Sequence, residues 1–449
     1  MKRVLLLVAG ISCCCSGFSQ VIDNYTNSTN TFTEIGNASH GISSPQDLDF
    51  VPGRPNELWV LNKETAGGSV VLFFNPGQSN QFVQFRRDSH NEHFMAKAVA
   101  LAFGDNDYFA TAQEIQSTAG PTATFMGPAL WNSDTSVFAR MHQNNWVPGQ
   151  LLGSHIDMLH QSPFGMGIAH DNANVYWYFD GYNGNICRYD FAQPHGVGED
   201  DHSDGRIRRY TDVTVTRKPN VPSHMVLDKQ NNWLYIVDGG GGKVFRIKTT
   251  SGTVGANLQV PASGAEPLAE YKEVTGATKE IMVTGLTSPS GIDYRNDRLF
   301  VSDQATGNIH IYNTTTTPAT PVGTIITGGP GVTGLRVTWD NRIWYVNTMT
   351  NKLMRIDNSN VAGIDETITN NLNFNIYPNP AHGNLNIKLD DMTSGEALIR
   401  IFDMSGRQVY THSTANQLTT INTSGWATGM YHIVLSYNNG SATTKVMIQ

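Results

Sequence analysis

The middle of the chain repeats one pattern of short strands, and this repeat limits the possible folds more than any other feature. The pattern is clearest in four segments, Gly167–Tyr189, His224–Ile247, Gly291–Tyr312 and Gly334–Ile356. Each has a short apolar strand, an Asn/Asp turn, an aromatic-rich strand, a Gly/Asn turn and a third alternating strand. Degenerate copies begin at Asp47 and Ala98. One unit of this kind cannot bury both of its faces, so the units are expected to stack on one another.

Six such units, each completed by an outer strand, predict an all-β chain with a six-bladed β-propeller. Candidate outer strands are Phe82–Phe85 and Arg206–Tyr210, and Thr31–Ile35 is expected to pair with the last blade and close the ring. The repeat resembles NHL-type propellers, which carry a Gly-Ile-Ala-x-Asp strand followed by a strand ending in Asp. Gly167–Asp180 and Gly291–Asp303 match best. This resemblance covers about residues 45–358 and implies a fold rather than an activity.

The last 77 residues predict a separate small β-sandwich. Pro378 and Pro380 favour a turn, and Leu385–Leu389 then alternates apolar and polar residues as a half-buried strand does. The region resembles the C-terminal sorting domain of type IX secretion substrates of the Bacteroidetes. The resemblance rests on four motifs: Tyr377–Gly383, Asp403–Arg407, Gly429–Tyr431 and Lys445–Ile448. It implies the type IX secretion machinery as partner and export across the outer membrane, and it implies no chemistry.

The first 19 residues have the pattern of a secretory signal peptide. Lys2 and Arg3 precede the apolar run Val4–Ile11, and Gly17 and Ser19 provide small residues for cleavage. Cys13–Cys15 leave a lipoprotein as an alternative. No later apolar run is long enough for a transmembrane segment. The predicted order is signal peptide (1–19), propeller (20–360), linker (361–372) and sorting domain (373–449).

Composition narrows the partners and the means of stabilisation. The formal net charge is -8, only 15% of residues are charged and no basic run occurs, which argues against nucleic acid as a partner. Once the signal peptide is removed, Cys187 is the remaining cysteine, so no internal disulfide can form. Its strand-like surroundings predict a buried, inert thiol.

Histidines are concentrated in one part of the repeat region, with nine of the 14 lying between His90 and His224. In a blade, the loops that enter the first strand and the turns between the second and third strands share one face. Five histidines precede or open first strands and are predicted to gather on this face near the axial funnel: His90, His93, His155, His160 and His224. His170 could point into the channel, and His195 and His202 are expected on the opposite face.

These positions predict a transition-metal site, with zinc or copper as the ion. The candidate ligands are His224, His155, His160, His93, His90 and His170. Asp157 and Glu92 are candidate carboxylate ligands, orienting partners or general bases. Met158, Met166 and Met225 would favour copper if they were ligands, although methionine in such strands usually fills the core. The acidic loop Asp200–Asp204 is a possible calcium site.

Two groups of propeller enzymes likewise hold a metal ion in the propeller. Val221–Leu227 looks like the Pro-His-Ser-x-x-Leu strand entry of the peptidyl-α-hydroxyglycine α-amidating lyases, which hold zinc with three histidines at the axis. The histidine stands one position later here, and Pro163-Phe-Gly and Pro289-Ser-Gly replace the motif in other blades. Propeller lactonases and sugar-acid hydrolases use calcium with Glu, Asn and Asp, for which Glu114, Asn347 and Asp303 are candidates.

The sequence therefore supports several functions. The first is a secreted or surface propeller with a metal site, acting as a lyase or hydrolase. The alternative is a non-catalytic propeller that binds a glycan, peptide or protein through aromatic residues such as Tyr182 and Trp233. Metal storage or scavenging would use the same histidines without turnover. The sequence shows no serine-nucleophile elbow, phosphate loop or cysteine-based zinc motif.

Overall fold

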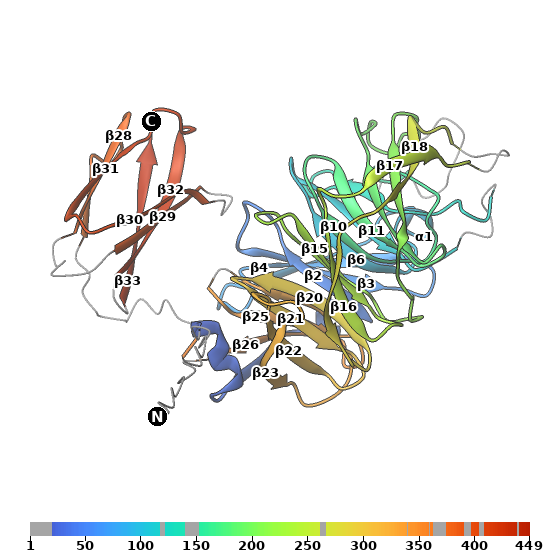
Figure 1. Cartoon of the computed structure of the whole chain (residues 1–449), viewed down its shortest axis with the longest axis horizontal. Coiled ribbons are helices and arrows are strands. Elements are labelled where there is room, and N and C mark those ends of the chain that lie inside the picture. Colours follow the sequence, from blue (N-terminus) through green and yellow to red (C-terminus); the bar gives the residue numbers. More distant parts are fainter. Residues whose placement is uncertain are drawn as a thin grey trace, which may run out of the picture.

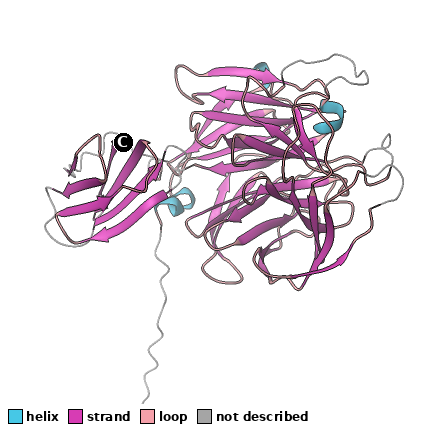
Figure 2. Cartoon of the chain, turned by 90° about the horizontal axis from the view of Figure 1, so that it is seen from above, coloured by secondary structure: helices cyan, strands magenta, loops and turns pink. Residues whose placement is uncertain are grey.

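A computed structural model describes most of the chain between residues 20 and 449, and almost all of its elements are strands (Figures 1 and 2). The described ranges are 20–116, 122–139, 152–260, 266–338, 340–358, 360–361, 374–389, 397–403, 408–437 and 440–449. The predicted signal peptide, and all but the first residue of the predicted linker, lie outside these ranges. The described helical elements are short: η1 (Val21–Thr26), η2 (Ala38–His40) and α1 (Asn91–Phe94).

Residues 31–357 form six successive sheets. The first contains β2 (Pro45–Phe50), β3 (Glu57–Lys63), β4 (Gly68–Phe74) and β5 (Phe82–Arg86). The second contains β6 (Ala98–Phe103), β7 (Tyr108–Gln113), β8 (Ala129–Asn132) and β9 (His155–Met158). The third contains β10 (Gly165–His170), β11 (Val175–Asp180), β12 (Asn185–Asp190) and β13 (Arg206–Thr214), extended by β18 (Glu270–Thr275) and β17 (Thr253–Asn257).

The remaining three sheets continue the same order. The fourth contains β14 (Met225–Asp228), β15 (Trp233–Asp238), β16 (Lys243–Lys248) and β19 (Lys279–Thr284). The fifth contains β20 (Pro289–Arg295), β21 (Arg298–Asp303), β22 (Asn308–Asn313) and β23 (Thr320–Ile326). The sixth contains β24 (Val332–Val337), β25 (Ile343–Asn347), β26 (Lys352–Asp357) and, from the other end of the chain, β1 (Thr31–Gly36).

The first strands of these sheets contact one another in a closed cycle, which makes the arrangement propeller-like. β2 contacts β6 and β24, and β10, β14 and β20 complete the cycle between them. The repeated glycine of the sequence pattern has a steric reason at this centre. A Cβ on Gly167 would lie 2.1 Å from Ser223 O, and one on Gly291 would lie 2.0 Å from Thr333 O. Neighbouring backbones approach too closely there for any side chain.

The N-terminal segment closes the last sheet, as the sequence predicted. β1 pairs antiparallel with β26, with Thr31 opposite Asp357. η1 precedes β1 and buries Ile22 and Tyr25 in a core shared with the fifth and sixth sheets. Asp23 of η1 also forms a buried bidentate pair with Arg298 of β21, at 2.7 and 2.8 Å. The segment 21–36 is therefore joined to the fifth and sixth sheets, as in the pair of Asp23 with Arg298, 275 residues later, by hydrogen bonds, apolar packing and one ion pair.

Replacing Asp23 by alanine is expected to destabilise this closure. The substitution removes both carboxylate oxygens from a guanidinium group that is buried in β21, and breaking a buried pair from one side costs about 3–5 kcal/mol. Denaturant unfolding of Asp23→Ala against the parent chain measures this loss. Val21→Ala changes a side chain of the same helix that is 59% exposed and is expected to lie within about 0.5 kcal/mol of the parent. A loss of unfolding free energy in Asp23→Ala as small as that in Val21→Ala would contradict the expectation.

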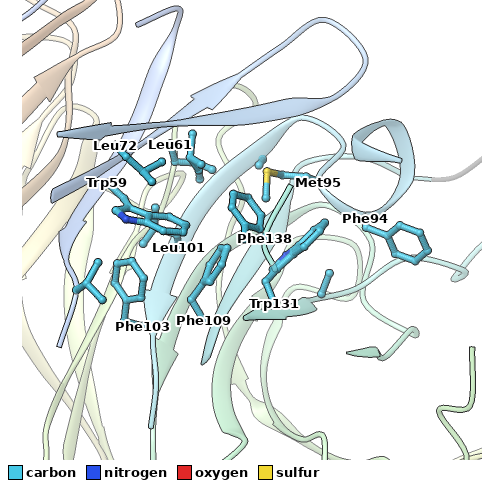
Figure 3. Close-up of a cluster of buried hydrophobic side chains, with 14 of the residues drawn as sticks. Trp59, Leu61, Leu72, Phe94, Met95, Leu101, Phe103, Phe109, Trp131 and Phe138 are labelled. Atoms are coloured by element: carbon cyan, nitrogen blue, oxygen red, sulfur yellow. The ribbon is translucent and has the colours of Figure 1, made fainter. Parts of the chain in front are cut away.

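Aromatic residues of the second and third strands, together with Phe138 after β8, fill the space between the first two sheets. Figure 3 shows the cluster between the first and second sheets, where Trp59, Phe109, Trp131 and Phe138 pack together. Their ring centroids lie 5.1–6.2 Å apart. Such packing explains the aromatic-rich strand in each repeat. Cys187 is buried and free, as predicted.

Two features of this region depart from the sequence expectations. β9 is the fourth strand of the second sheet, whereas the sequence pattern placed residues 154–160 in a loop that enters the third unit. β17 and β18 are inserted between β16 and β19 of the fourth sheet, but β18 pairs in parallel with β13 of the third. The insertion brings residues near 266 beside the second and third sheets.

The C-terminal region forms two further sheets around one core. The three-stranded sheet contains β27 (Phe374–Tyr377), β28 (Asn384–Leu389) and β31 (Leu418–Asn422). The four-stranded sheet contains β29 (Ala397–Asp403), β30 (Gln408–Thr414), β32 (Gly429–Tyr437) and β33 (Gly440–Ile448). Leu385, Ile401 and Ile433 belong to the same buried cluster, so apolar faces of both sheets share it.

Candidate metal centre

A group of histidines gathers at the outer strand of the second sheet. His155 begins β9 and His160 lies two residues after its end. His155 is fully buried, and its ring stacks on Phe94 of α1 with centroids 3.5 Å apart. His160 is 4% exposed and stacks on Phe125 at 3.9 Å. These aromatic contacts fix the planes of both imidazole rings.

The loop between β12 and β13 carries two more histidines to the same place. Its backbone pairs with the start of β9, because Leu152 N donates to Gly198 O at 2.7 Å and Gly198 N donates to His155 O at 2.8 Å. The centroids of the His195 and His202 rings lie 5.0 and 6.2 Å from that of His155.

The prediction that His195 and His202 lie on the opposite face from His155 is therefore wrong. Their loop connects the third and fourth strands of the third sheet. His155 begins the fourth strand of the second sheet, and fourth strands start on the face where such loops lie. The sequence pattern had assigned His155 to a loop on the other face.

Glu266, just before β18, joins two of these histidines. One carboxylate oxygen, Oε2, accepts hydrogen bonds from His160 Nδ1 at 2.7 Å and from His202 Nδ1 at 2.8 Å. Burial opposes ionisation of Glu266, but these two hydrogen bonds outweigh it and lower the pKa of the carboxyl to about 2. Glu266 is therefore an anion at any physiological pH.

Each of the four imidazoles has its Nδ1 next to an acceptor. His155 Nδ1 lies 2.8 Å from Leu152 O, and His195 Nδ1 lies 2.6 Å from Gly196 O. Carbonyl and carboxylate oxygens only accept, so each Nδ1 carries a proton and each neutral ring has its lone pair on Nε2. Metal-ligating histidines have this same outer arrangement, in which the second nitrogen donates to a carbonyl or carboxylate.

The Nε2 atoms of His195 and His202 lie 3.1 Å apart. Two lone pairs at this separation repel each other unless a proton or a cation lies between them. Ligand nitrogens at 2.0–2.1 Å from a tetrahedral zinc ion are separated by about 3.3 Å, so the observed spacing is close to that of two zinc ligands.

The Nε2 of His155 is buried without a hydrogen-bonding partner. Burial also lowers the pKa of His155 and of His195, which keeps these rings neutral and able to bind a metal.

Two groups of three ligand-type side chains have donor atoms within 4.8 Å of one another in the described part of the chain. They are His155 with His195 and His202, and His160 with His202 and Glu266. Of the predicted ligands, the structure therefore brings together His155 and His160. His93 lies next to them, with its ring centroid 6.2 Å from that of His160. Burial, and then His160, lowers the pKa of His93 to about 4.

The other predicted ligands have different surroundings. His90 lies 3.6 Å from Glu92, and its Nε2 is buried without a partner. His224 donates from Nε2 to Val99 O at 2.9 Å, and its Nδ1 lies 3.6 Å from Asp47. These contacts reach from the start of the fourth sheet to the second and first sheets, at the centre of the ring. His170 bonds to Ala173 O and to Lys229 instead of facing a metal cluster.

The candidate calcium ligands are engaged in local structure. Asp303 accepts from the backbone N–H groups of Thr287 and Ser288, and Asn347 accepts from those of Met349 and Thr350. Glu114 pairs with Lys63 at 2.6 Å and with Arg217 at 3.0 Å. In the acidic loop, Asp201 accepts from the Ser203 N–H and hydroxyl, and Asp204 from the Gln193 N–H.

The three methionines near these histidines all lie in hydrophobic clusters: Met158, Met166 and Met225. The nearby donor set is therefore nitrogen and carboxylate oxygen. Sequence reasoning missed Glu266 completely, since nothing in its local sequence distinguishes it from other surface glutamates.

The C-terminal part of the chain matches a known protein family. Residues 375–449 match the family of secretion system C-terminal sorting domains. The predicted resemblance is thereby confirmed, and the sorting domain directs the protein through type IX secretion to the cell surface or the medium. None of the described helices has the length and apolar character needed to cross a membrane.

Several solved structures are similar to the chain at low sequence identity. One is PorZ, a surface component of the type IX secretion system of Porphyromonas gingivalis (14% identity, TM-score 0.37, 88% of this chain and 58% of that one). Another is an auxiliary nutrient binding protein from Bacteroides ovatus (10% identity, TM-score 0.46, 73% of this chain and 76% of that one). A third is a streptogramin B lyase (11% identity, TM-score 0.40, 73% of this chain and 97% of that one). No curated protein shows significant sequence similarity to the chain.

Proposed function

We propose that the exported protein is a six-bladed, NHL-type β-propeller that binds one zinc ion through Nε2 of His155, His195 and His202. The observation that carries this proposal is the convergence of these imidazoles while each Nδ1 is already hydrogen-bonded to an oxygen. Zinc is preferred over copper(I) because the nearby methionines are core residues and supply no thioether ligand. The site lies at the outer edge of the second and third sheets and not at the axial funnel.

Three histidine ligands leave one zinc coordination position for water or substrate, and zinc in such sites lowers the pKa of bound water to about 7. This supports a metal-dependent hydrolase or lyase as the activity. The protein's own groups prepare the site for this chemistry. Glu266 orients His202, and Phe94 fixes the ring of His155. His195, the most exposed of the three ligands, gives access from solvent.

Metal analysis of the full chain, purified without an affinity tag, tests the proposal. About one zinc ion per chain is expected, either as purified or after zinc is added and excess removed. Less than a tenth of an equivalent after loading would end the proposal. Ester and lactone substrates then separate an enzyme from a metal-storage protein, since storage predicts full occupancy without turnover.

Glu266→Gln is expected to weaken zinc binding by about 10–100-fold, because loss of an outer carboxylate that orients a ligating histidine has effects of that size. The neutral amide also removes a negative charge from beside the cation. Competition with a chromophoric chelator measures the affinity. Glu270→Gln is the matched control, since Glu270 lies on β18 and pairs with Arg208 instead of a histidine. Equal zinc affinities of the two variants would show that Glu266 does not support the site.

A second candidate function is binding of a glycan or peptide without catalysis. Phe82 and Phe85 of the outer strand β5 are 55% and 46% exposed. Arg87 lies over the Phe85 ring at 5.2 Å, and Phe85 lines an open hollow of about 550 Å³. If this surface is the functional one, Phe85→Ala weakens capture of glycans from an array while His195→Ala leaves it unchanged. The reverse pattern favours the metal site.

A further inference from the structure

The geometry points to a second metal ion beside the first, with His202 bridging the two ions as an imidazolate. The second ion would be held by Nδ1 of His202, Nδ1 of His160 and a carboxylate oxygen of Glu266. This inference rests on the proposed zinc site, because the first ion occupies Nε2 of the same His202 ring. The ligand class is a pair of divalent transition-metal ions.

The donor atoms of this second site are already together. Glu266 Oε2 lies 2.7 Å from His160 Nδ1 and 2.8 Å from His202 Nδ1. Two ligands of one tetrahedral zinc or similar ion are separated by about 3.3 Å, so each contact must open by roughly 0.5 Å. His202 is the one residue common to both groups of ligand-type side chains found in the described ranges. A bridging imidazolate needs further ligand groups beside each of its two ring nitrogens. In His202, the His195 ring lies beside Nε2 and Glu266 lies beside Nδ1.

Charge favours the ion at this position. The side chains of His160 and His202 are each 4% exposed, so an unbalanced divalent charge beside them would be costly. Glu266 supplies one negative charge, and the imidazolate of His202, shared between the two ions, supplies another, which together offset part of the charge that the second ion adds. The Glu266 side chain is 30% exposed, which gives the second ion a route from solvent.

The protons balance in a simple way. In the hydrogen-bonded state His160 and His202 each carry a proton on Nδ1. When the second ion binds, His202 releases its Nδ1 proton to solvent, and the proton of His160 moves to Nε2. One proton is therefore released for each second ion bound. The first ion assists this step, because a cation on Nε2 makes the Nδ1 proton of the same ring more acidic.

Copper(II) titration of the full, untagged chain tests the inference, with electron paramagnetic resonance as the readout. The first equivalent is expected to give a mononuclear signal. The second equivalent is expected to release one proton and to diminish that signal, since two copper ions couple magnetically through an imidazolate. His160→Ala should bind one equivalent with an undiminished signal, whereas Glu270→Gln should behave as the parent does.

The outcomes separate the two proposals. If the parent chain binds no first equivalent, the proposed zinc site fails together with this inference. If it binds one equivalent and no more, the zinc site stands and the second ion is ruled out. A second equivalent whose signal simply adds to the first, without proton release, would be bound elsewhere on the surface and would also overturn the bridge.

Discussion

His202→Ala is expected to abolish specific metal binding, with an affinity loss greater than the 10–100-fold typical of outer-shell changes. Alanine removes one of the three imidazoles of the proposed zinc site, which lie close together. It also removes the hydrogen-bond donor that orients Glu266. His202 lies in the loop between β12 and β13 and contributes to no strand pairing, so we expect the sheets to form in the variant although this side chain is buried. Chelator competition and metal content of the purified variant measure the effect.

His310→Ala provides the matched control for this substitution. His310 lies on β22 of the fifth sheet, where its Nδ1 lies 3.0 Å from Thr324 Oγ1. It belongs to neither group of ligand-type side chains described above. The control should keep the zinc content of the parent chain. If His202→Ala retains zinc with an affinity within about threefold of the parent, the three-histidine site is wrong.

Deleting residues 375–449 is expected to stop export almost completely. This range carries the sorting domain that directs the protein through type IX secretion. Its sheets bury their own apolar cluster, so the deletion removes a self-contained unit and leaves the sheets of residues 31–357 complete. In a type IX-competent host, immunoblots of cell fractions should find the shortened chain in the periplasm and the full chain at the surface or in the medium.

A metal-site variant supplies the control for the deletion. Full-length His202→Ala keeps the sorting domain and should be exported like the parent, because the export signal does not include the histidine cluster. Recovery of the shortened chain at the cell surface would contradict the assignment of the export signal. Retention of both variants inside the cell would instead indicate that the histidine loop is needed for folding before export.

Much of the fold could be predicted from the sequence because its determinants are local. Alternation of apolar and polar residues identified the strands. Three of the six units open with glycine, at Gly167, Gly291 and Gly334, and the structure explains Gly167 and Gly291 by close approaches between neighbouring backbones. The pairing of residues 31–35 with the last sheet was also predictable, because an unpaired strand had to complete the final unit. The sorting domain was recognisable from motifs that lie within one short region.

The chain therefore determined by itself its strands, its repeated units, its export domain and the presence of many imidazoles in one stretch. Only the tertiary structure decided which imidazoles meet. His155 reaches His202 because β9 joins the second sheet as its outer strand, and Glu266 reaches His160 because an insertion from the fourth sheet pairs with the third. Glu266 is 106 residues from His160 and 64 from His202. Local patterning sets how a strand forms, but the choice of its distant neighbour depends on packing of the whole ring.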